Sequence, residues 1–137
     1  MTKTSKKIAL APIVLFTYNR PKHLKTVIEA LKLNQQSRHS DLFIFSDGAK
    51  DKTDKNVAEV RKYLQKIDGF KSIKIFKSEI NNGLAKQIIN GVTHVINQYG
   101  MAIVLEDDIV VSPHFLNYMN NSLDTFAKEK KVWHISA

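Results

Sequence analysis

The sequence has no cysteine, and no apolar run in it approaches the roughly 20 residues needed to cross a bilayer. Disulfide bonds and thiolate metal sites are therefore excluded, so any metal must be held by Asp, Glu, His or backbone oxygen. Neither a GxGxxG turn nor a GxxxxGK(S/T) loop occurs, which argues against the common dinucleotide-binding and NTPase classes. The five histidines show no metal-ligand or triad spacing, so none is assigned a catalytic role.

The chain does contain enough apolar material for a folded core. Its 137 residues are 43% hydrophobic, which predicts a single globular domain over residues 1–137. The net charge of +8 favours anionic partners, but does not choose among nucleic acid, anionic lipid and phosphorylated ligands. Lys3, Lys6 and Lys7 precede an apolar run, as in a signal peptide, but no small-residue cleavage site follows, and we interpret the run as leading into a buried strand.

Apolar runs of strand length alternate four times with segments of helical period, which predicts an α/β fold with a mostly parallel sheet flanked by helices. The expected strands are 13–17, 42–45, 73–76 and 101–105, and the expected helices are one beginning at Pro21, 54–67, 84–99 and one opened by Ser112-Pro113. Gly100 is the expected C-cap of the third helix. We expect Leu84 and Phe126 on buried helix faces, and another strand near 133–137 whose abrupt end suggests a truncated chain.

Polar residues follow each expected strand, at the sheet edge where open α/β folds bind ligands. They are Thr17-Tyr18-Asn19-Arg20, Ser46-Asp47-Gly48, Asn81-Asn82-Gly83 and Glu106-Asp107-Asp108. Three adjacent carboxylates at a strand end repel one another unless a cation or hydrogen-bond donors compensate them. Hard oxygen ligands select Mg²⁺ or Mn²⁺. Strand alternation predicts Glu106 and Asp108 on one side and Asp107 on the other, whereas the alternative interpretation is an ordinary solvated acidic turn.

Three further residues have two interpretations each. Asp47 either accepts a hydrogen bond from a base or ribose, or caps the turn that Gly48 closes. Arg20 either clamps a phosphate or is a surface charge beside a helix start. Lys86, in the first turn of its helix, either lies beside a phosphate bound at the helix amides or is a surface lysine.

Several motifs resemble those of GT-A glycosyltransferases. The stretch PIVLFTYNR from Pro12 to Arg20 is similar to their first strand and nucleotide loop, and Asn82-Gly83-Leu84-Ala85 resembles the NxGLA turn of family 2 enzymes. Residues 102–137, AIVLEDDIVVSPHFLNYMNNSLDTFAKEKKVWHISA, are similar to the EDD region of the N-acetylglucosaminyltransferase I group. The resemblance implies the nucleotide-sugar-binding half of a GT-A, Rossmann-like domain.

The resemblance also implies roles for individual residues. Asp108 becomes the direct ligand of Mn²⁺ or Mg²⁺ in a DXD-like motif, and Glu106 and Asp107 contact the donor's sugar or ribose, or the metal through water. Asp47 reads the uracil, and Arg20 lies near the nucleotide phosphates with the loop residues Thr17, Tyr18 and Asn19. Lys86 is carried over less securely, because the transferase I group has a different residue near that position.

The implied activity is hexosyl or N-acetylhexosaminyl transfer from a UDP-sugar to a hydroxyl of a saccharide or lipid-linked acceptor. The catalytic base is expected on a segment beyond residue 137, so this portion alone is expected to bind the donor and not necessarily to transfer it. The alternatives are a nucleotidyltransferase, which normally needs a glycine-rich phosphate loop, and a non-catalytic binding domain. No nucleic acid is expected, since the aromatics do not interleave with the lysines. The expected location is the cytoplasm, with peripheral contact at the inner membrane face.

Overall fold

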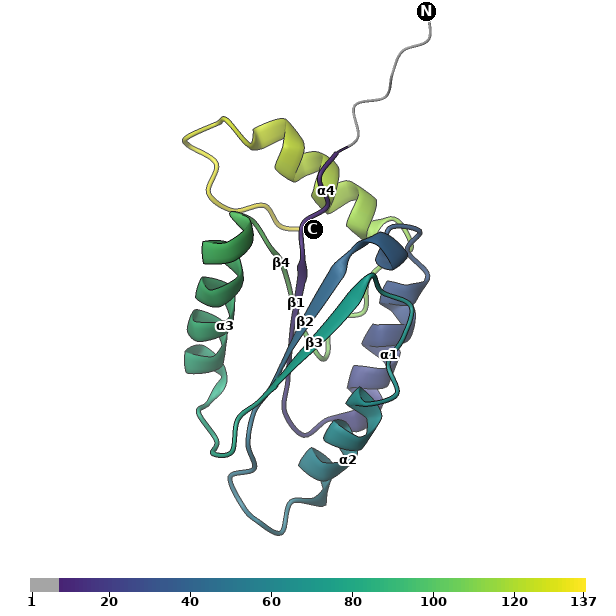
Figure 1. The fold of residues 1–137 in the computed structure, drawn as a ribbon, viewed down its shortest axis with the longest axis vertical. Coiled ribbons are helices and arrows are strands. Elements are labelled where there is room, and N and C mark those ends of the chain that lie inside the picture. Colours follow the sequence, from purple (N-terminus) through teal and green to yellow (C-terminus); the bar gives the residue numbers. More distant parts are fainter. Residues whose placement is uncertain (1–7) are drawn as a thin grey trace, which may run out of the picture.

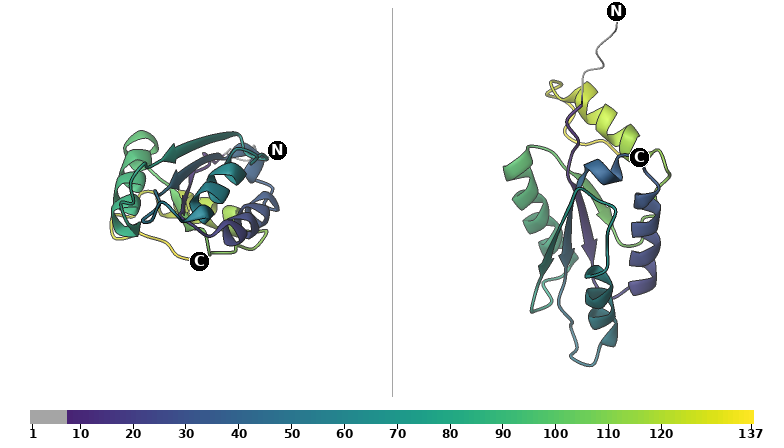
Figure 2. Two further views of the ribbon diagram at one scale, coloured as in Figure 1. Left: turned by 90° about the horizontal axis from the view of Figure 1, so that it is seen from below. Right: turned by 45° about the vertical axis from the view of Figure 1, so that its right-hand side comes forward.

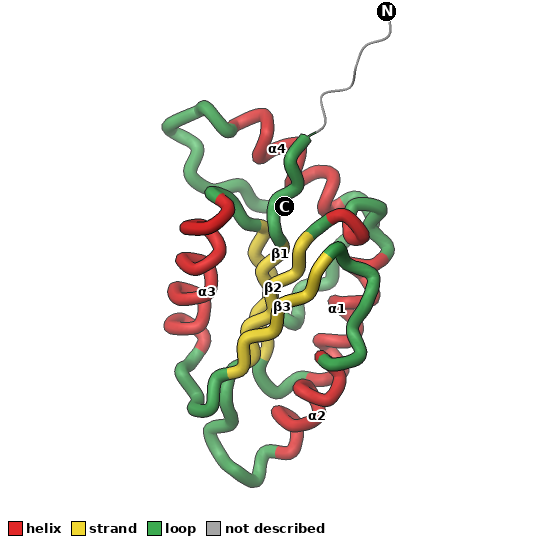
Figure 3. The backbone as a smooth tube through the Cα atoms, viewed as in Figure 1, coloured by secondary structure: helices red, strands yellow, loops and turns green. Residues whose placement is uncertain are grey.

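The computed structural model describes residues 8–137 and has a parallel four-stranded sheet between helices (Figures 1 and 3). The interpretation of Lys3, Lys6 and Lys7 lies outside these residues. In chain order the elements are β1 (Ile13–Thr17), α1 (Pro21–Lys32), the 3-10 helix η1 (Ser37–His39), β2 (Asp41–Ser46), α2 (Lys55–Leu64), β3 (Ser72–Lys77), α3 (Leu84–Tyr99), β4 (Ile103–Glu106) and α4 (Phe115–Phe126). Within this part of the chain, no helix has the length and apolar content that a membrane crossing requires.

The strand order is β3-β2-β1-β4, and every neighbouring pair is parallel. The sheet grows in one direction from β1 through β2 to β3, and then the chain returns to place β4 on the other side of β1. Strand order thus reverses between β1 and β4, which is where open α/β sheets form their ligand crevice. The predicted α/β class is confirmed.

The two faces of the sheet are covered by different helices. Helices α1 and α2 lie on one face and α3 on the other (Figures 1 and 2). Alternate residues of β1 divide accordingly: Ile13 and Leu15 pack in the core with α1 and α2, whereas Val14 and Phe16 pack against α3. Helix α4 lies near the end of the sheet where the strands begin, and the Asn120 Oδ1 atom accepts a 2.8 Å hydrogen bond from the backbone N–H of Ala11.

Helix α3 approaches the sheet closely because Gly91 has no side chain. A Cβ atom at that position would lie 2.7 Å from the Phe16 ring and 3.0 Å from the Phe45 ring. These two rings stack with centroids 5.5 Å apart and form the floor beneath the first turns of α3. Gly100 ends the helix in the left-handed conformation, as predicted, with φ of 76°.

The structure corrects several local predictions. Helix α4 begins at Phe115, with His114 as N-cap, and not at Ser112-Pro113. Residues 133–137 form no strand (Figure 3), and Leu84 and Phe126 are 54% and 44% exposed instead of buried. Helix α2 ends three residues earlier than expected, and β4 is shifted toward the acidic triplet, so that Glu106 is its last residue.

Candidate functional site

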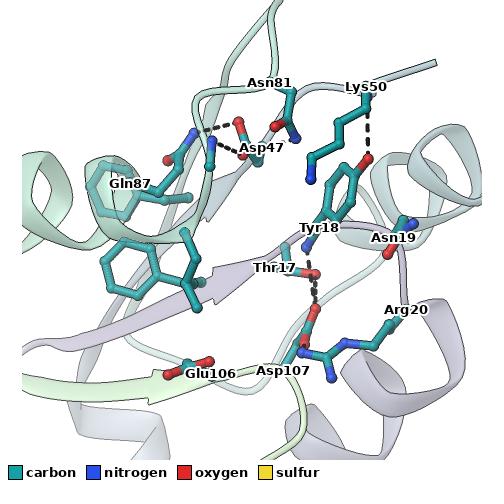
Figure 4. A pocket seen from close by; sticks show the side chains of 14 residues that line it. Thr17, Tyr18, Asn19, Arg20, Asp47, Lys50, Asn81, Gln87, Glu106 and Asp107 are labelled. Atoms are coloured by element: carbon teal, nitrogen blue, oxygen red, sulfur yellow. Dashed lines mark hydrogen bonds and ion pairs between the residues drawn. The ribbon is translucent and has the colours of Figure 1, made fainter. Parts of the chain in front are cut away.

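A pocket of about 330 Å³ opens at the carboxyl ends of β1, β2 and β4, beside the start of α3 (Figure 4). Its lining residues are Phe16, Thr17, Tyr18, Asn19, Arg20, Phe45, Asp47, Lys50, Asn81, Gly83, Leu84, Gln87, Glu106 and Asp107. The pocket therefore collects side chains from four separate strand–helix connections. Of the predicted site residues, all line it except Lys86, which is exposed on α3, and Asp108.

Asp107 joins the end of β4 to the loop after β1. Its buried carboxylate, 2% exposed, accepts hydrogen bonds from the Thr17 hydroxyl at 2.9 Å and the Tyr18 backbone N–H at 3.2 Å. Its other oxygen pairs with the Arg20 guanidinium at 2.6 Å. Because every oxygen of this carboxylate has a partner, Asp107 is an organiser of the loop that forms one wall of the pocket.

Arg20 bridges two carboxylates of the acidic triplet. One guanidinium nitrogen lies 2.6 Å from Asp107, and the other lies 2.9 Å from the Asp108 Oδ2 atom. Burial by itself works against the charged guanidinium, but the charges and hydrogen bonds of the two aspartates prevail and raise the pKa of Arg20. The compensation that three adjacent carboxylates require is thus supplied in part by an arginine from the loop after β1.

Glu106 and Asp108 lie in different surroundings. Glu106 is the register partner of Phe16, so it lies on the α3 side of the sheet and lines the pocket. Within residues 8–137, no hydrogen-bond donor or cation pairs with its carboxylate. Asp108 instead borders a smaller depression with Lys22, His23, Thr26 and Val110. The two carboxylates that sequence alternation placed on one side thus border two different hollows, because the chain turns after Glu106.

The acidic triplet fits one mode of divalent-cation binding and not another. No group of three or more His, Asp or Glu side chains in residues 8–137 can enclose a metal ion. Mg²⁺ and similar ions, however, are commonly held by one or two carboxylates together with waters and substrate phosphates. Glu106 and the Oδ1 atom of Asp108 have no other partner among the described residues, so each offers oxygen to a cation whose other ligands are waters and phosphate oxygens.

Asp47, at the end of β2, is the most heavily hydrogen-bonded side chain of the pocket. It is 5% exposed. Its two oxygens accept from the backbone N–H groups of Gly48 (2.9 Å), Asn82 (2.9 Å) and Gly83 (3.0 Å), and from the side-chain amides of Asn81 (3.2 Å) and Gln87 (2.9 Å). Burial opposes ionisation, but these hydrogen bonds outweigh it and lower the pKa of Asp47. The sequence suggested that Asp47 contacts either a ligand or its own turn. In the structure its carboxylate also holds the loop before α3, about 35 residues away.

The same two loops are also drawn together by their backbones. A Cβ atom at Gly48 would lie 2.5 Å from the carbonyl of Ile80, so only glycine permits this approach. From the face of the sheet that α2 covers, the Arg61 guanidinium donates hydrogen bonds to the backbone carbonyls of Ser46, Asp47 and Ser78. Arg61 therefore clamps the carboxyl ends of β2 and β3, which carry opposite sides of the Asp47 network.

Sequence reasoning missed several lining residues. Gln87 carried a signal, because it is a polar residue one turn before Gly91 on the inward side of α3, and it is 7% exposed. Asn81 was noted among the polar residues after a strand but was not assigned a role. Lys50 had no signal, since its position in a lysine-rich loop is typical of a solvated surface residue. Its place in the pocket depends on how that loop folds over Tyr18.

Comparisons with known proteins identify the family and agree with the fold. Residues 13–128 match the profile of the family described as glycosyl transferase family 2. No curated protein sequence matches the chain. Among solved structures, S. aureus TarS 1–349 superposes with a TM-score of 0.60 at 16% identity over 87% of this chain and 33% of that one. The same fragment in complex with UDP superposes with a TM-score of 0.60 at 17% identity, over 87% of this chain and 33% of that one. A longer TarS chain superposes with a TM-score of 0.60 at 17% identity, over 87% of this chain and 20% of that one. The chain thus spans about a third or less of each TarS chain, and the likeness shows the fold.

Proposed function

The chain belongs to glycosyl transferase family 2, and from this membership we propose that its pocket binds a nucleotide-diphosphate sugar, with UDP as the nucleotide. The observation that carries the proposal is the convergence of Arg20, Asp47, Glu106 and Asp107 on one pocket at the reversal of strand order. A TarS structure that superposes on the chain is a complex with UDP, which supports the choice of nucleotide. Because the matched family is one of glycosyltransferases, the nucleotidyltransferase alternative is not retained.

The pocket's own residues suit a ligand with an aromatic base and a charged tail. The Phe16, Phe45 and Tyr18 rings provide apolar surface, and the Asp47 network keeps the loop before α3 at a fixed distance from them. We propose that Asp108 binds Mn²⁺ or Mg²⁺ directly, and that Glu106, which lines the pocket, contacts the donor or the ion through a water molecule. Such an ion, when bound, neutralises the charge that develops on a departing diphosphate.

In the proposed reaction the bond between the sugar's anomeric carbon and the diphosphate oxygen breaks, and a bond forms to an acceptor hydroxyl oxygen. UDP leaves with the electron pair of the broken bond, and the hydroxyl proton passes to a general base. We assign no base among residues 8–137 and expect it elsewhere in the protein. Saccharide or lipid-linked acceptors, and a cytoplasmic site of action at the inner membrane face, remain part of this proposal.

Calorimetry with UDP, UDP-GlcNAc and UDP-Glc, each with and without Mn²⁺, tests the proposal. Metal-dependent binding is expected for the unaltered chain, and Asp108→Ala is expected to remove the metal dependence. Asp68→Ala is the matched control, because Asp68 is 81% exposed and, within residues 8–137, its one ion pair is with Lys32 on the surface. Absence of binding to all three nucleotides by a folded chain would refute the donor-site assignment.

A further inference from the structure

The pocket is lined by more carboxylates than cationic side chains. Its lining residues include the carboxylates of Asp47, Glu106 and Asp107 but only two cations, those of Arg20 and Lys50. A nucleoside diphosphate adds about two to three further negative charges at neutral pH, since the second ionisation of a phosphate group has a pKa of about 6. Even with one divalent cation bound as proposed, the negative charges exceed the positive ones, so a bound diphosphate is stabilised by a wall cation that no carboxylate neutralises.

Arg20 cannot supply that charge freely. Its two terminal nitrogens are engaged by Asp107 at 2.6 Å and by Asp108 at 2.9 Å. The Asp107 partner is buried, so separating the pair leaves a desolvated carboxylate with less compensation. Arg20 is thus committed to the acidic triplet in this structure.

Lys50 is the uncommitted cation of the pocket. Among residues 8–137, no carboxylate lies within salt-bridge distance of its ammonium group. Figure 4 shows its side chain running beside Tyr18, with the ammonium end turned into the pocket that Lys50 lines. An exposed lysine normally extends into solvent, so this placement depends on the backbone that carries it.

The backbone of the loop between β2 and α2 is anchored on the opposite wall. The Lys50 N–H donates a hydrogen bond to the Tyr18 hydroxyl at 3.2 Å. Farther along, the Asn19 side-chain amide donates to Asp54 at 2.9 Å, and Asp54 caps α2 through the Asn56 N–H. Both contacts tie the loop to the residues after β1, so the backbone that carries Lys50 is held at the pocket wall.

We propose that Lys50 binds a phosphate of the nucleotide that the pocket takes up, an inference that rests on the proposed donor-binding function. A lysine ammonium on a flexible stem suits this role, because it acts as a point charge that follows a phosphate without fixed geometry. Lys50 contributes affinity for the diphosphate and none for the nucleoside, and its contribution decreases as salt is added.

Comparing UDP with uridine isolates the phosphate contact. Binding of both ligands to the unaltered chain, Lys50→Gln and Lys52→Gln is followed by NMR chemical-shift titration at low and high salt. Lys52 is the matched control, because it lies two residues away in the same loop and does not line the pocket. Circular dichroism and thermal unfolding confirm that each variant is folded.

We expect Lys50→Gln to weaken UDP binding about fivefold to tenfold, the size of one charge-assisted hydrogen bond at a partly exposed site. Uridine binding should stay unchanged, Lys52→Gln should resemble the unaltered chain, and the loss should shrink at high salt. Equal weakening of UDP and uridine, or unchanged UDP binding, would overturn the role of Lys50 while leaving the donor site in place. If the unaltered chain binds no UDP, the proposed function and this inference both fail.

Discussion

The Thr17 hydroxyl donates a 2.9 Å hydrogen bond to the buried carboxylate of Asp107, across 90 residues of sequence. This contact links the end of β1 to the end of β4, the two strands between which the sheet reverses its order. It also holds Asp107 where the Tyr18 backbone and Arg20 can reach it. One wall of the pocket therefore depends on a hydroxyl that does not itself need to contact a ligand.

Replacing that hydroxyl tests how much it contributes to the free energy of unfolding. Thr17→Val keeps the shape of the side chain but leaves a buried carboxylate with one donor fewer, so we expect the free energy of unfolding to fall by about 1–3 kcal/mol. Urea titration measures the loss. Thr26→Val is the control, because the Thr26 hydroxyl donates a hydrogen bond to the Lys22 carbonyl on an exposed face of α1. This substitution should change the free energy of unfolding little. Equal losses in the two variants would contradict the special role of Thr17.

Asp47 should make stability depend on pH. The pKa of its carboxyl is lowered in the folded state, so its contribution to stability is complete above the unfolded-state value of about 3.9 and is lost as pH falls through the folded-state value. Asp47→Asn places an amide donor among five donors, and we expect it to cost roughly 2–3 kcal/mol at pH 7.

Urea titrations between pH 7 and pH 3 measure this dependence. The difference between the unaltered chain and Asp47→Asn should narrow as the pH decreases, because protonation removes the advantage of the carboxylate. Glu79→Gln, on the exposed loop after β3, serves as the comparison and should leave the stability at pH 7 nearly unchanged. A difference that stays constant down to pH 3 would argue against an ionised Asp47 at the centre of the network.

Gly91 should not tolerate alanine despite lying within a helix. A methyl group there meets the Phe16 and Phe45 rings at 2.7 and 3.0 Å, so α3 must move away from the sheet. Overpacking costs about 1–3 kcal/mol, which equals or exceeds the gain of about 1 kcal/mol from the better helix propensity of alanine. We expect Gly91→Ala to lower the free energy of unfolding and to weaken UDP binding, because Leu84 and Gln87 move with the helix. Asn90→Ala, one residue earlier on the exposed face, should be neutral or slightly stabilising, and a stabilised Gly91→Ala would show that the helix does not pack this closely.

Arg20 should compete with a divalent cation for Asp108. Arg20→Gln releases the Asp108 Oδ2 atom, so the affinity for Mn²⁺ without nucleotide should rise roughly twofold to fivefold, as expected for loss of a half-exposed ion pair. Electron paramagnetic resonance counts free Mn²⁺ directly, independent of any transferase activity. Lys25→Gln removes a charge of the same sign from an exposed position of α1 and should change the affinity less. If Arg20→Gln binds Mn²⁺ no more tightly, Asp108 is not shared between the two cations.

The sequence predicted those features that follow from local pattern. The strand β1, the bounds of α3 and the Gly100 cap were confirmed, because apolar period and glycine placement determine them locally. The pocket position followed from the rule that ligands bind at strand ends. Burial of Leu84 and Phe126 was wrong, since helical spacing identifies a stripe but not how far the sheet beneath it extends.

The partners of the site residues could not be predicted in the same way. The carboxylates of Asp47 and Asp107 are satisfied by groups up to 90 residues away, and nothing in their local sequence identifies those groups. Arg20 was interpreted as a phosphate ligand or a surface charge, yet the structure pairs it with Asp107 and Asp108. The triplet itself indicates only that a cation or hydrogen-bond donors must compensate it, and no local pattern identifies Arg20, 88 residues before Asp108, as part of that compensation.

The position of β4 has a consequence for the nascent chain. Strand β1 has its five residues buried and lies between β2 and β4, but β4 is synthesised after β1, β2 and β3. Until residues 103–106 emerge and pair, one edge of β1 has unsatisfied backbone groups beside some of the most apolar side chains of the protein. Translation therefore passes through an interval in which β1 is open to pairing with another chain, and that interval ends with the same residues that complete the acidic wall of the pocket.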